Sequence, residues 1–165
     1  HTDLVKKLDY ECELAVVLGR DARDVPAGQT RDYIFGYTIL NDVSARDVQT
    51  AHKQWYFGKS LDGFTPIGPC IVTADAFADY PPRLGIRSFV NGEKRQDSNT
   101  ALQIFDIDHV IAELSQGMTL KAGTIIATGT PAGVGMGMDP PQFLKPGDVV
   151  RCEIDGIGTL TNPVK

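Results

Sequence analysis

The stretch DYECELAVVL, residues 9–18, decides the fold class of this 165-residue chain. Its run of Leu, Ala and Val, followed by a segment rich in Asp, Pro and Gly, is typical of a buried strand. Alternate side chains of a strand share a face, so Glu11 and Glu13 point to one side and Cys12 and Leu14 to the other. The stretch therefore predicts a sheet and places two carboxylates at the start of one of its strands.

Short elements of the same kind fill the rest of the chain. Seventeen Gly and ten Pro indicate many turns, and so a fold of short strands rather than a helix bundle. Ser44 and Asp47 have the form of a helix capping box, with Asp in place of the usual Glu. The prediction is a mostly β (α+β) fold with a few short helices, forming a single domain over residues 1–165. Its expected elements are strands at 9–18, 33–40, 67–73 and 124–127, hairpins at 84–98 (turning at Asn91-Gly92) and 148–161 (turning at Asp155-Gly156), a short helix at 44–50 and an amphipathic helix at 105–116.

Composition excludes several classes of protein. The net charge is −5 without a basic run, so nucleic acid is not expected as a partner. No apolar run approaches the roughly 20 residues needed to cross a membrane. The three cysteines, Cys12, Cys70 and Cys152, lie far apart in apolar strand-like runs. They predict buried, reduced thiols and a cytoplasmic protein.

Three carboxylates form the first candidate site. Glu11 and Glu13 lie roughly 7 Å apart along one strand face, where they repel each other unless a cation lies between them. Asp42 ends the next predicted strand and would complete a set of hard oxygen ligands suited to Mg²⁺ or Mn²⁺. A solvated strand edge for the Glu pair, and a turn or cap role for Asp42, are the alternatives.

Cationic and amide side chains follow in the sequence. Arg46 and Gln49 share one helix face and could hold a substrate carboxylate or carbonyl. Lys59 follows the aromatic run 55–57 and could be a partly desolvated lysine that stabilises an enolate or oxyanion. An exposed helix face and a solvent-facing lysine are the corresponding alternatives. His52 could approach the same site, or lie at a surface helix end.

A Gly-rich loop, TGTPAGVG at residues 128–135, follows the strand predicted at 124–127. Its backbone N–H groups and the Thr130 hydroxyl would form a cradle for a carboxylate, with Gly129 beside it. The glycine spacing, with no helix after it, argues against a dinucleotide fold. The alternative is a tight crossover turn.

Five ordered segments together resemble the fumarylacetoacetate hydrolase family. They extend over almost the whole chain, and they are YECELAVVLG (10–19), ILNDVSARDVQ (39–49), WYFGKSLDGFTPIGP (55–69), GMTLKAGTIIATGTPAGVG (117–135) and FLKPGDVVRCEIDGIGTLTNPV (143–164). The resemblance implies a β-roll or β-sandwich of mixed sheets, usually as a homodimer. It also implies that an N-terminal lid, which carries a His and a Glu acting on water in hydrolytic members, is missing from this chain.

The resemblance further implies a divalent-metal enzyme acting on small 2-oxo acids. Glu11, Glu13 and Asp42 match its Mg²⁺ or Mn²⁺ ligands, a place that Ca²⁺ can take in crystals. Lys59 matches the lysine beside the substrate, Thr130 the residue that holds the 1-carboxylate, and Arg46 and Gln49 the contacts to the distal part. C–C bond hydrolysis of an acylpyruvate or fumarylpyruvate through a metal-bound enolate is the first expectation.

Other activities stay open at this point. Decarboxylation or isomerisation of related oxo-dioic acids is the alternative within the family, and residues 138–150 resemble bacterial members linked to aromatic catabolism. A non-catalytic metal- or sugar-binding β-domain and a purely structural oligomerisation module are the alternatives of other classes.

Overall fold

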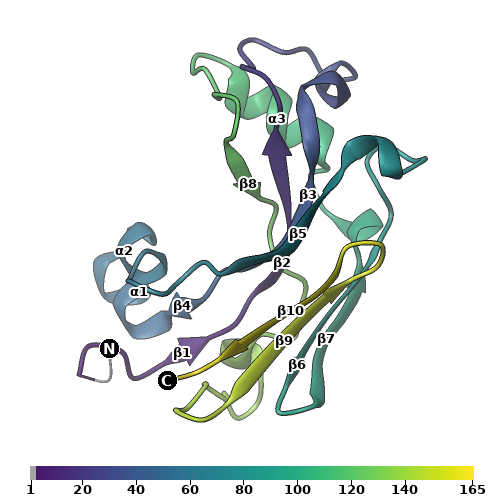
Figure 1. The fold of residues 1–165 in the computed structure, drawn as a ribbon. Helices are drawn as coiled ribbons and strands as arrows, with labels where there is room; N and C mark the ends of the chain where they lie inside the picture. The colour runs from purple at the N-terminus through teal and green to yellow at the C-terminus, as the bar shows by residue number, and fades with distance from the viewer. Residues whose placement is uncertain (1–2) are drawn as a thin grey trace.

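Two four-stranded sheets make up most of the protein (Figure 1). The computed structural model describes residues 3–165, except for the side chain of His52. One sheet has the strand order β5-β3-β2-β8 and the other the order β10-β9-β6-β7. The strands are β1 (Leu8–Asp9), β2 (Cys12–Leu18), β3 (Ile34–Asn41), β4 (Ser44–Ala45), β5 (Ile67–Thr73), β6 (Gly85–Val90), β7 (Glu93–Asn99), β8 (Ile125–Ala127), β9 (Val149–Ile154) and β10 (Gly158–Pro163).

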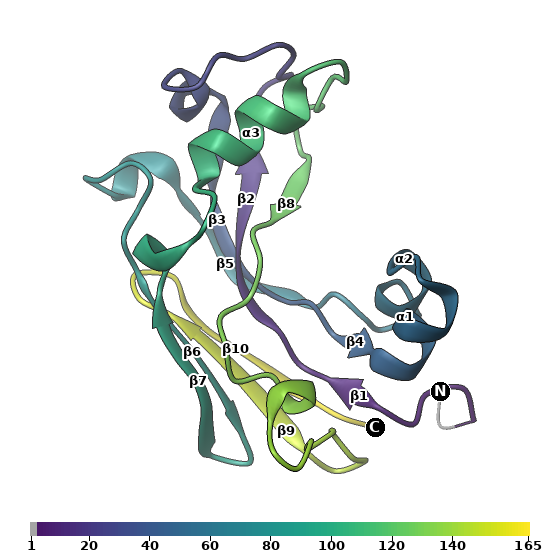
Figure 2. The same ribbon diagram turned by 180° about the vertical axis from the view of Figure 1, so that it is seen from behind.

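Helices occupy the ends of this framework, as the two views show (Figures 1 and 2). The α-helices are α1 (Arg46–His52), α2 (Tyr56–Lys59) and α3 (Ile107–Ser115), and the 3-10 turns are η1 (Thr30–Tyr33), η2 (Ala74–Ala76), η3 (Thr100–Leu102) and η4 (Gly135–Gly137). Asp106 caps α3 by accepting a hydrogen bond from the His109 N–H, and Ile107 and Ile111 are buried. The mostly β fold with a few short helices, and the amphipathic helix, are therefore confirmed.

The strand pairings follow the predicted turns. The hairpin of β6 and β7 turns at Asn91 and Gly92, both with positive φ, and that of β9 and β10 turns beside Gly156. The resemblance implied mixed sheets, but every pairing between the named strands of the described residues is antiparallel. The connections between neighbouring strands therefore return each strand antiparallel to the one before it, whether they are tight turns or, as between β3 and β5, contain helices.

The hydrophobic core lies between the two sheets. Every residue of β2 is buried, and this strand lies between β3 and β8 in its own sheet and packs against β6 and β9 of the other. Leu14 and Val16 are completely buried, as is Cys152 on β9 opposite them. Burial of such side chains stabilises the fold by roughly 1.5–3 kcal/mol each.

Local details correct three of the predictions. The strand expected at 9–18 is interrupted, because Leu8–Asp9 pairs with β4 while Cys12–Leu18 pairs with β3. The capping box at Ser44 and Asp47 is wrong: the N-cap is Ala45, without a side-chain cap, because Ser44 belongs to β4. Burial of all three thiols is also wrong, since Cys70 lies exposed on the edge strand β5.

Membrane-spanning helices are not found in the part of the chain that the structure describes, since none of its helices is long and apolar enough.

Gly133 allows the Gly-rich loop to pack against the backbone of β7. Its φ is 111°, and an added Cβ would lie 2.1 Å from the Arg95 carbonyl oxygen. We expect Gly133→Ala to lower the free energy of unfolding by more than about 1 kcal/mol, because both the conformation and the contact exclude a side chain. Chemical denaturation measures this. Gly137→Ala is the matched control, since its nearest neighbour would be 3.7 Å away, and equal losses would contradict the prediction.

Candidate metal and substrate site

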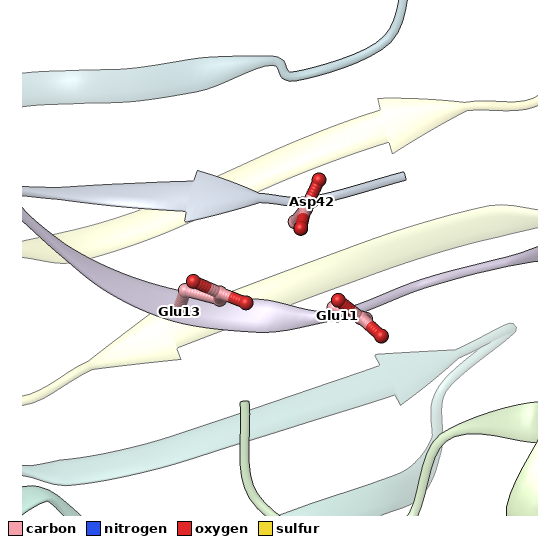
Figure 3. A group of neighbouring side chains, drawn as sticks. All are labelled: Glu11, Glu13 and Asp42. Atoms are coloured by element: carbon pink, nitrogen blue, oxygen red, sulfur yellow. The ribbon is translucent and has the colours of Figure 1, made fainter. Parts of the chain in front are cut away.

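Sheet register brings the three predicted carboxylates together (Figure 3). Cys12 at the start of β2 pairs with Asn41 at the end of β3, so Glu11 and Glu13 flank the position where Asp42 leaves its strand. One ligand atom from each of the three carboxylates lies within 4.8 Å of the others. The three carboxylates thus form one cluster that could hold a cation, at the ends of the two central strands of the sheet.

Lys59, at the end of α2, points into this cluster. Its Nζ lies 2.7 Å from Glu11 Oε2 and 2.5 Å from Asp42 Oδ2, and it donates to the Ser44 hydroxyl. Burial acts to lower the pKa of Lys59, but the hydrogen bonds and charges of Asp42 and Glu11 outweigh it and hold the pKa above its usual range. Lys59 is thus partly desolvated and stays cationic at neutral pH, while its part in stabilising an enolate or oxyanion stays a prediction.

Arg46 forms salt bridges with two neighbouring carboxylates. Its Nε donates to Asp9 Oδ2 at 2.9 Å, and its NH2 lies 2.6 Å from Glu11 Oε1. Its NH1 donates to Gln49 Oε1 at 3.1 Å, so the two residues share a helix face as predicted. The guanidinium thus fixes the orientation of Glu11, and contact of Arg46 and Gln49 with a substrate stays a prediction.

Asp9 is a site residue that the sequence did not reveal. Its completely buried carboxylate accepts the backbone N–H groups of Tyr10, Gly135 and Met136 in addition to Arg46. It thereby connects the Gly-rich loop to the helix that carries Arg46. Nothing in the sequence marks it, because the groups that satisfy a buried charge come from distant segments.

Glu13 has the least compensated charge of the cluster. Its side chain is buried, it accepts the Gly129 N–H at 2.8 Å, and no salt bridge to it occurs among the described residues. Burial, and then the charges of Asp42 and Glu11, raise the pKa of Glu13 to about 7, against the lowering effect of the Gly129 N–H. The ionised form of Glu13 is therefore unfavourable unless a cation lies beside it.

The donor set fits a divalent cation. Four carboxylates, Asp9, Glu11, Glu13 and Asp42, share only two cationic partners, Arg46 and Lys59, in the described part of the chain. The ionised cluster therefore carries an excess of two negative charges in a mostly buried place. Oxygen-only donors of this kind are suited to Mg²⁺ or Mn²⁺, and they would be Glu11, Glu13 and Asp42.

The loop residues Gly129 and Thr130 lie beside this cluster but are already hydrogen-bonded. The Gly129 N–H is used by Glu13, and the Thr130 hydroxyl donates to the Cys12 carbonyl oxygen at 2.9 Å. Their binding of a substrate carboxylate stays a prediction. The prediction for His52 lies outside the side chains that the structure describes.

In metal-free protein, Glu13 is expected to make stability depend on pH. Its folded pKa of about 7 lies above the value of 4.5 for an unperturbed Glu. The folded state therefore binds the proton more tightly, and this stabilisation, complete below pH 4.5, is lost as the pH rises through 7. In EDTA, the free energy of unfolding should fall with pH by up to about 1.4 kcal/mol per unit in that window.

Urea titrations across this pH range measure the slope. Glu13→Gln keeps an acceptor for the Gly129 N–H but cannot ionise, so its slope should be smaller by that amount. Equal slopes for the wild type and the variant would contradict the assignment.

Comparisons with known proteins identify the family of this chain. Residues 2–165 match the family model for the fumarylacetoacetate hydrolase C-terminal domain. A protein named oxaloacetate tautomerase YisK, of Bacillus subtilis, is 49% identical over 164 residues, which are 99% of this chain and 54% of that protein. The chain thus spans about half the length of this curated relative.

Solved structures are similar over the whole fold. A fumarylacetoacetate hydrolase of Exiguobacterium antarcticum is 52% identical with a TM-score of 0.97, covering 100% of this chain and 59% of that one. A 2-hydroxyhepta-2,4-diene-1,7-dioate isomerase of Mycobacterium marinum is 46% identical with a TM-score of 0.87. The similarity covers 97% of this chain and 59% of that one. The match to the family model over residues 2–165 shows that the chain belongs to the fumarylacetoacetate hydrolase family.

Proposed function

We propose that this protein catalyses keto–enol tautomerisation of a small 2-oxo acid, with a divalent cation at Glu11, Glu13 and Asp42. The observation that carries the proposal is the uncompensated acidic cluster with the Lys59 ammonium at its edge. Such a site combines a place for a cation with a fixed positive charge beside it. Both favour the build-up of negative charge on an oxygen of the substrate.

The relatives support proton transfer as the reaction. The Bacillus subtilis protein is named an oxaloacetate tautomerase, and the Mycobacterium marinum protein an isomerase of a 2-hydroxydienoate. Both reactions move a proton and a double bond next to an oxygen-bearing carbon. Tautomerisation asks less of a site than C–C hydrolysis, which also needs an activated water molecule.

The chain's own residues perform separate parts of this work. A bound divalent cation would supply Lewis acidity toward a 2-oxo oxygen. Lys59 remains protonated and adds positive charge where the enol oxygen develops negative charge, so its role is electrostatic. Arg46 holds Glu11 in place, and the Gly129 N–H holds Glu13.

C–C bond hydrolysis of an acylpyruvate, the first expectation from the sequence, is the second candidate. The observation in its favour is the similarity to the Exiguobacterium antarcticum structure, which is named a fumarylacetoacetate hydrolase. The same cation and Lys59 would stabilise the enolate that leaves when the C3–C4 bond breaks. A homodimer, the 2-oxo acid partner and a cytoplasmic location are proposals that accompany both candidates.

The test compares reactions of the full-length protein with Mg²⁺, Mn²⁺ or EDTA. We expect metal-dependent interconversion of the keto and enol forms of oxaloacetate, which a change in ultraviolet absorbance measures. Metal-dependent release of acetate from acetylpyruvate would establish the second candidate instead, and pyruvate with CO₂ from oxaloacetate would establish a decarboxylase. If none of these reactions responds to metal, the proposed function is wrong.

A further inference from the structure

Gln96 is the one residue of β7 that is buried, and its side chain is completely so. It lies opposite Ser88 on β6 and points between the two sheets, far in sequence from the carboxylates. A buried amide is costly unless its donors and acceptor are hydrogen-bonded. The hydrogen-bond partners of Gln96 therefore indicate its structural role.

Those partners belong to the strand and the loop that form the site. Gln96 Oε1 accepts the Cys12 N–H at 3.1 Å, while Nε2 donates to Thr130 Oγ1 at 2.8 Å and to the Pro131 carbonyl oxygen at 2.7 Å. The amide orientation is determined, because Cys12 N–H can only donate and the Pro131 carbonyl can only accept. Gln96 thus joins β2 to the Gly-rich loop through one rigid group.

The orientation of the Thr130 hydroxyl follows from the same logic. It accepts from Gln96 and must donate its single proton to the Cys12 carbonyl oxygen, 2.9 Å away. Gln96 and Thr130 therefore hold both the N–H and the C=O of Cys12. These groups belong to the two peptide bonds that connect Cys12 to Glu11 and to Glu13.

The strand needs this support because β8 does not reach it. Pairing of β2 with β8 covers Ala15 to Val17, and Thr128 still binds the Leu14 carbonyl oxygen. At Cys12 the side chains of Gln96 and Thr130 take the place of the missing neighbour strand. The peptide groups that aim the two Glu ligands would otherwise be unpaired on that edge.

We propose that Gln96 is a positioning residue, which sets the spacing of Glu11 and Glu13 and the place of Thr130 without touching cation or substrate. The inference rests on the proposed function, since it concerns the same site. Its consequence is that cation affinity depends on a side chain of the opposite sheet. Loss of an outer-shell partner typically costs roughly 10–100-fold in metal affinity or activity.

The test measures Mg²⁺ affinity by calorimetry, together with kcat and KM for the 2-oxo acid, in the full-length protein. Gln96→Met keeps the size of the side chain and removes the three hydrogen bonds, and we expect at least about a tenfold loss of Mg²⁺ affinity. Ser88→Ala is the matched control, since Ser88 Oγ is buried without a hydrogen-bond partner in the part of the chain described. The Mg²⁺ affinity of this variant should stay within about twofold of the wild-type affinity.

Thr130 supplies a second route to the same answer if Gln96→Met does not fold. Thr130→Val removes the hydroxyl and Thr130→Ser keeps it, so Mg²⁺ affinity should fall in the first and persist in the second. A residue that only contacted substrate would leave Mg²⁺ affinity unchanged. Where both single variants fold, the double variant of Gln96→Met and Thr130→Val should lose no more Mg²⁺ affinity than the more affected single variant, because the two residues act in one hydrogen-bond network.

The outcomes separate this inference from the proposed function. Wild-type protein that binds Mg²⁺ but converts no 2-oxo acid contradicts the function, while the affinity of Gln96→Met still decides the inference. The inference would be overturned by unchanged Mg²⁺ affinity in either Gln96→Met or Thr130→Val. It would also be overturned if the two losses of affinity multiplied in the double variant. Either result would leave the proposed function standing. No Mg²⁺ binding by the wild type would overturn both.

Discussion

Lys59→Met is expected to lower the turnover of a 2-oxo acid by about 100-fold or more. The ammonium is held between Glu11 and Asp42 and stays charged, so it acts on negative charge in the transition state without first having to move. Loss of one preorganised donor at a developing oxyanion costs roughly 10²–10³-fold. Steady-state kinetics with saturating Mg²⁺ measure the change.

Two further measurements make this result interpretable. Mg²⁺ affinity should persist in Lys59→Met, because removal of a nearby positive charge does not disfavour binding of a cation. Lys121→Met is the matched control, since Lys121 is exposed and pairs only with Asp21 in the described structure, and it should retain full turnover. If Lys59→Met turned over at the wild-type rate, Lys59 would have no part in the mechanism.

Asp42→Asn is expected to weaken Mg²⁺ binding by more than about 100-fold. Losing an outer-shell partner already costs roughly 10–100-fold, and this variant removes the charge of a ligand itself. Asn keeps the shape of the side chain and a carbonyl oxygen, so the change is in charge rather than in packing. Calorimetry, and the rise of the unfolding temperature on adding Mg²⁺, measure the loss.

The control for Asp42→Asn is Asp97→Asn, an exposed acid paired with Lys94 and Arg87 on the second sheet. It carries the same change of charge outside the cluster and should bind Mg²⁺ as the wild type does. Wild-type affinity in Asp42→Asn would remove this residue from the ligand set. Equal losses in both variants would instead point to a general effect of net charge.

Local sequence patterns predicted the secondary structure well where one short-range cause dominates. The turn at Asn91-Gly92 follows from the ease with which these residues adopt positive φ, and the amphipathic helix predicted at 105–116 follows from its apolar spacing. Prediction failed at Ser44, where pairing of β4 with β1 takes precedence over helix capping. It also failed at Cys70, because an apolar run on an edge strand is not necessarily covered.

The candidate site was predicted in part. Alternation along one strand placed Glu11 and Glu13 on one face, the end of the next predicted strand added Asp42, and the aromatic run 55–57 added the lysine that follows it, Lys59. The resemblance to the family then assigned these residues as metal ligands and as the lysine beside the substrate. The sequence did not show that Arg46 is bound to Asp9 and Glu11, because an arginine on a helix can reach many partners. It gave no indication of Asp9 or Gln96 either, whose partners lie as far as 127 and 84 residues away along the chain.

The sequence by itself thus determined the short strands, the tight turns and the residue types that can hold a cation, since these depend on neighbours within a few positions. Only the tertiary structure decided which carboxylates lie close enough to share a cation, which of them already have a cationic partner, and which buried amide is hydrogen-bonded to the strand between two of them. The physical reason is that charge compensation and hydrogen-bond satisfaction in a buried place depend on distance in space. Antiparallel pairing of β2 with β3 and packing of the two sheets create those distances here.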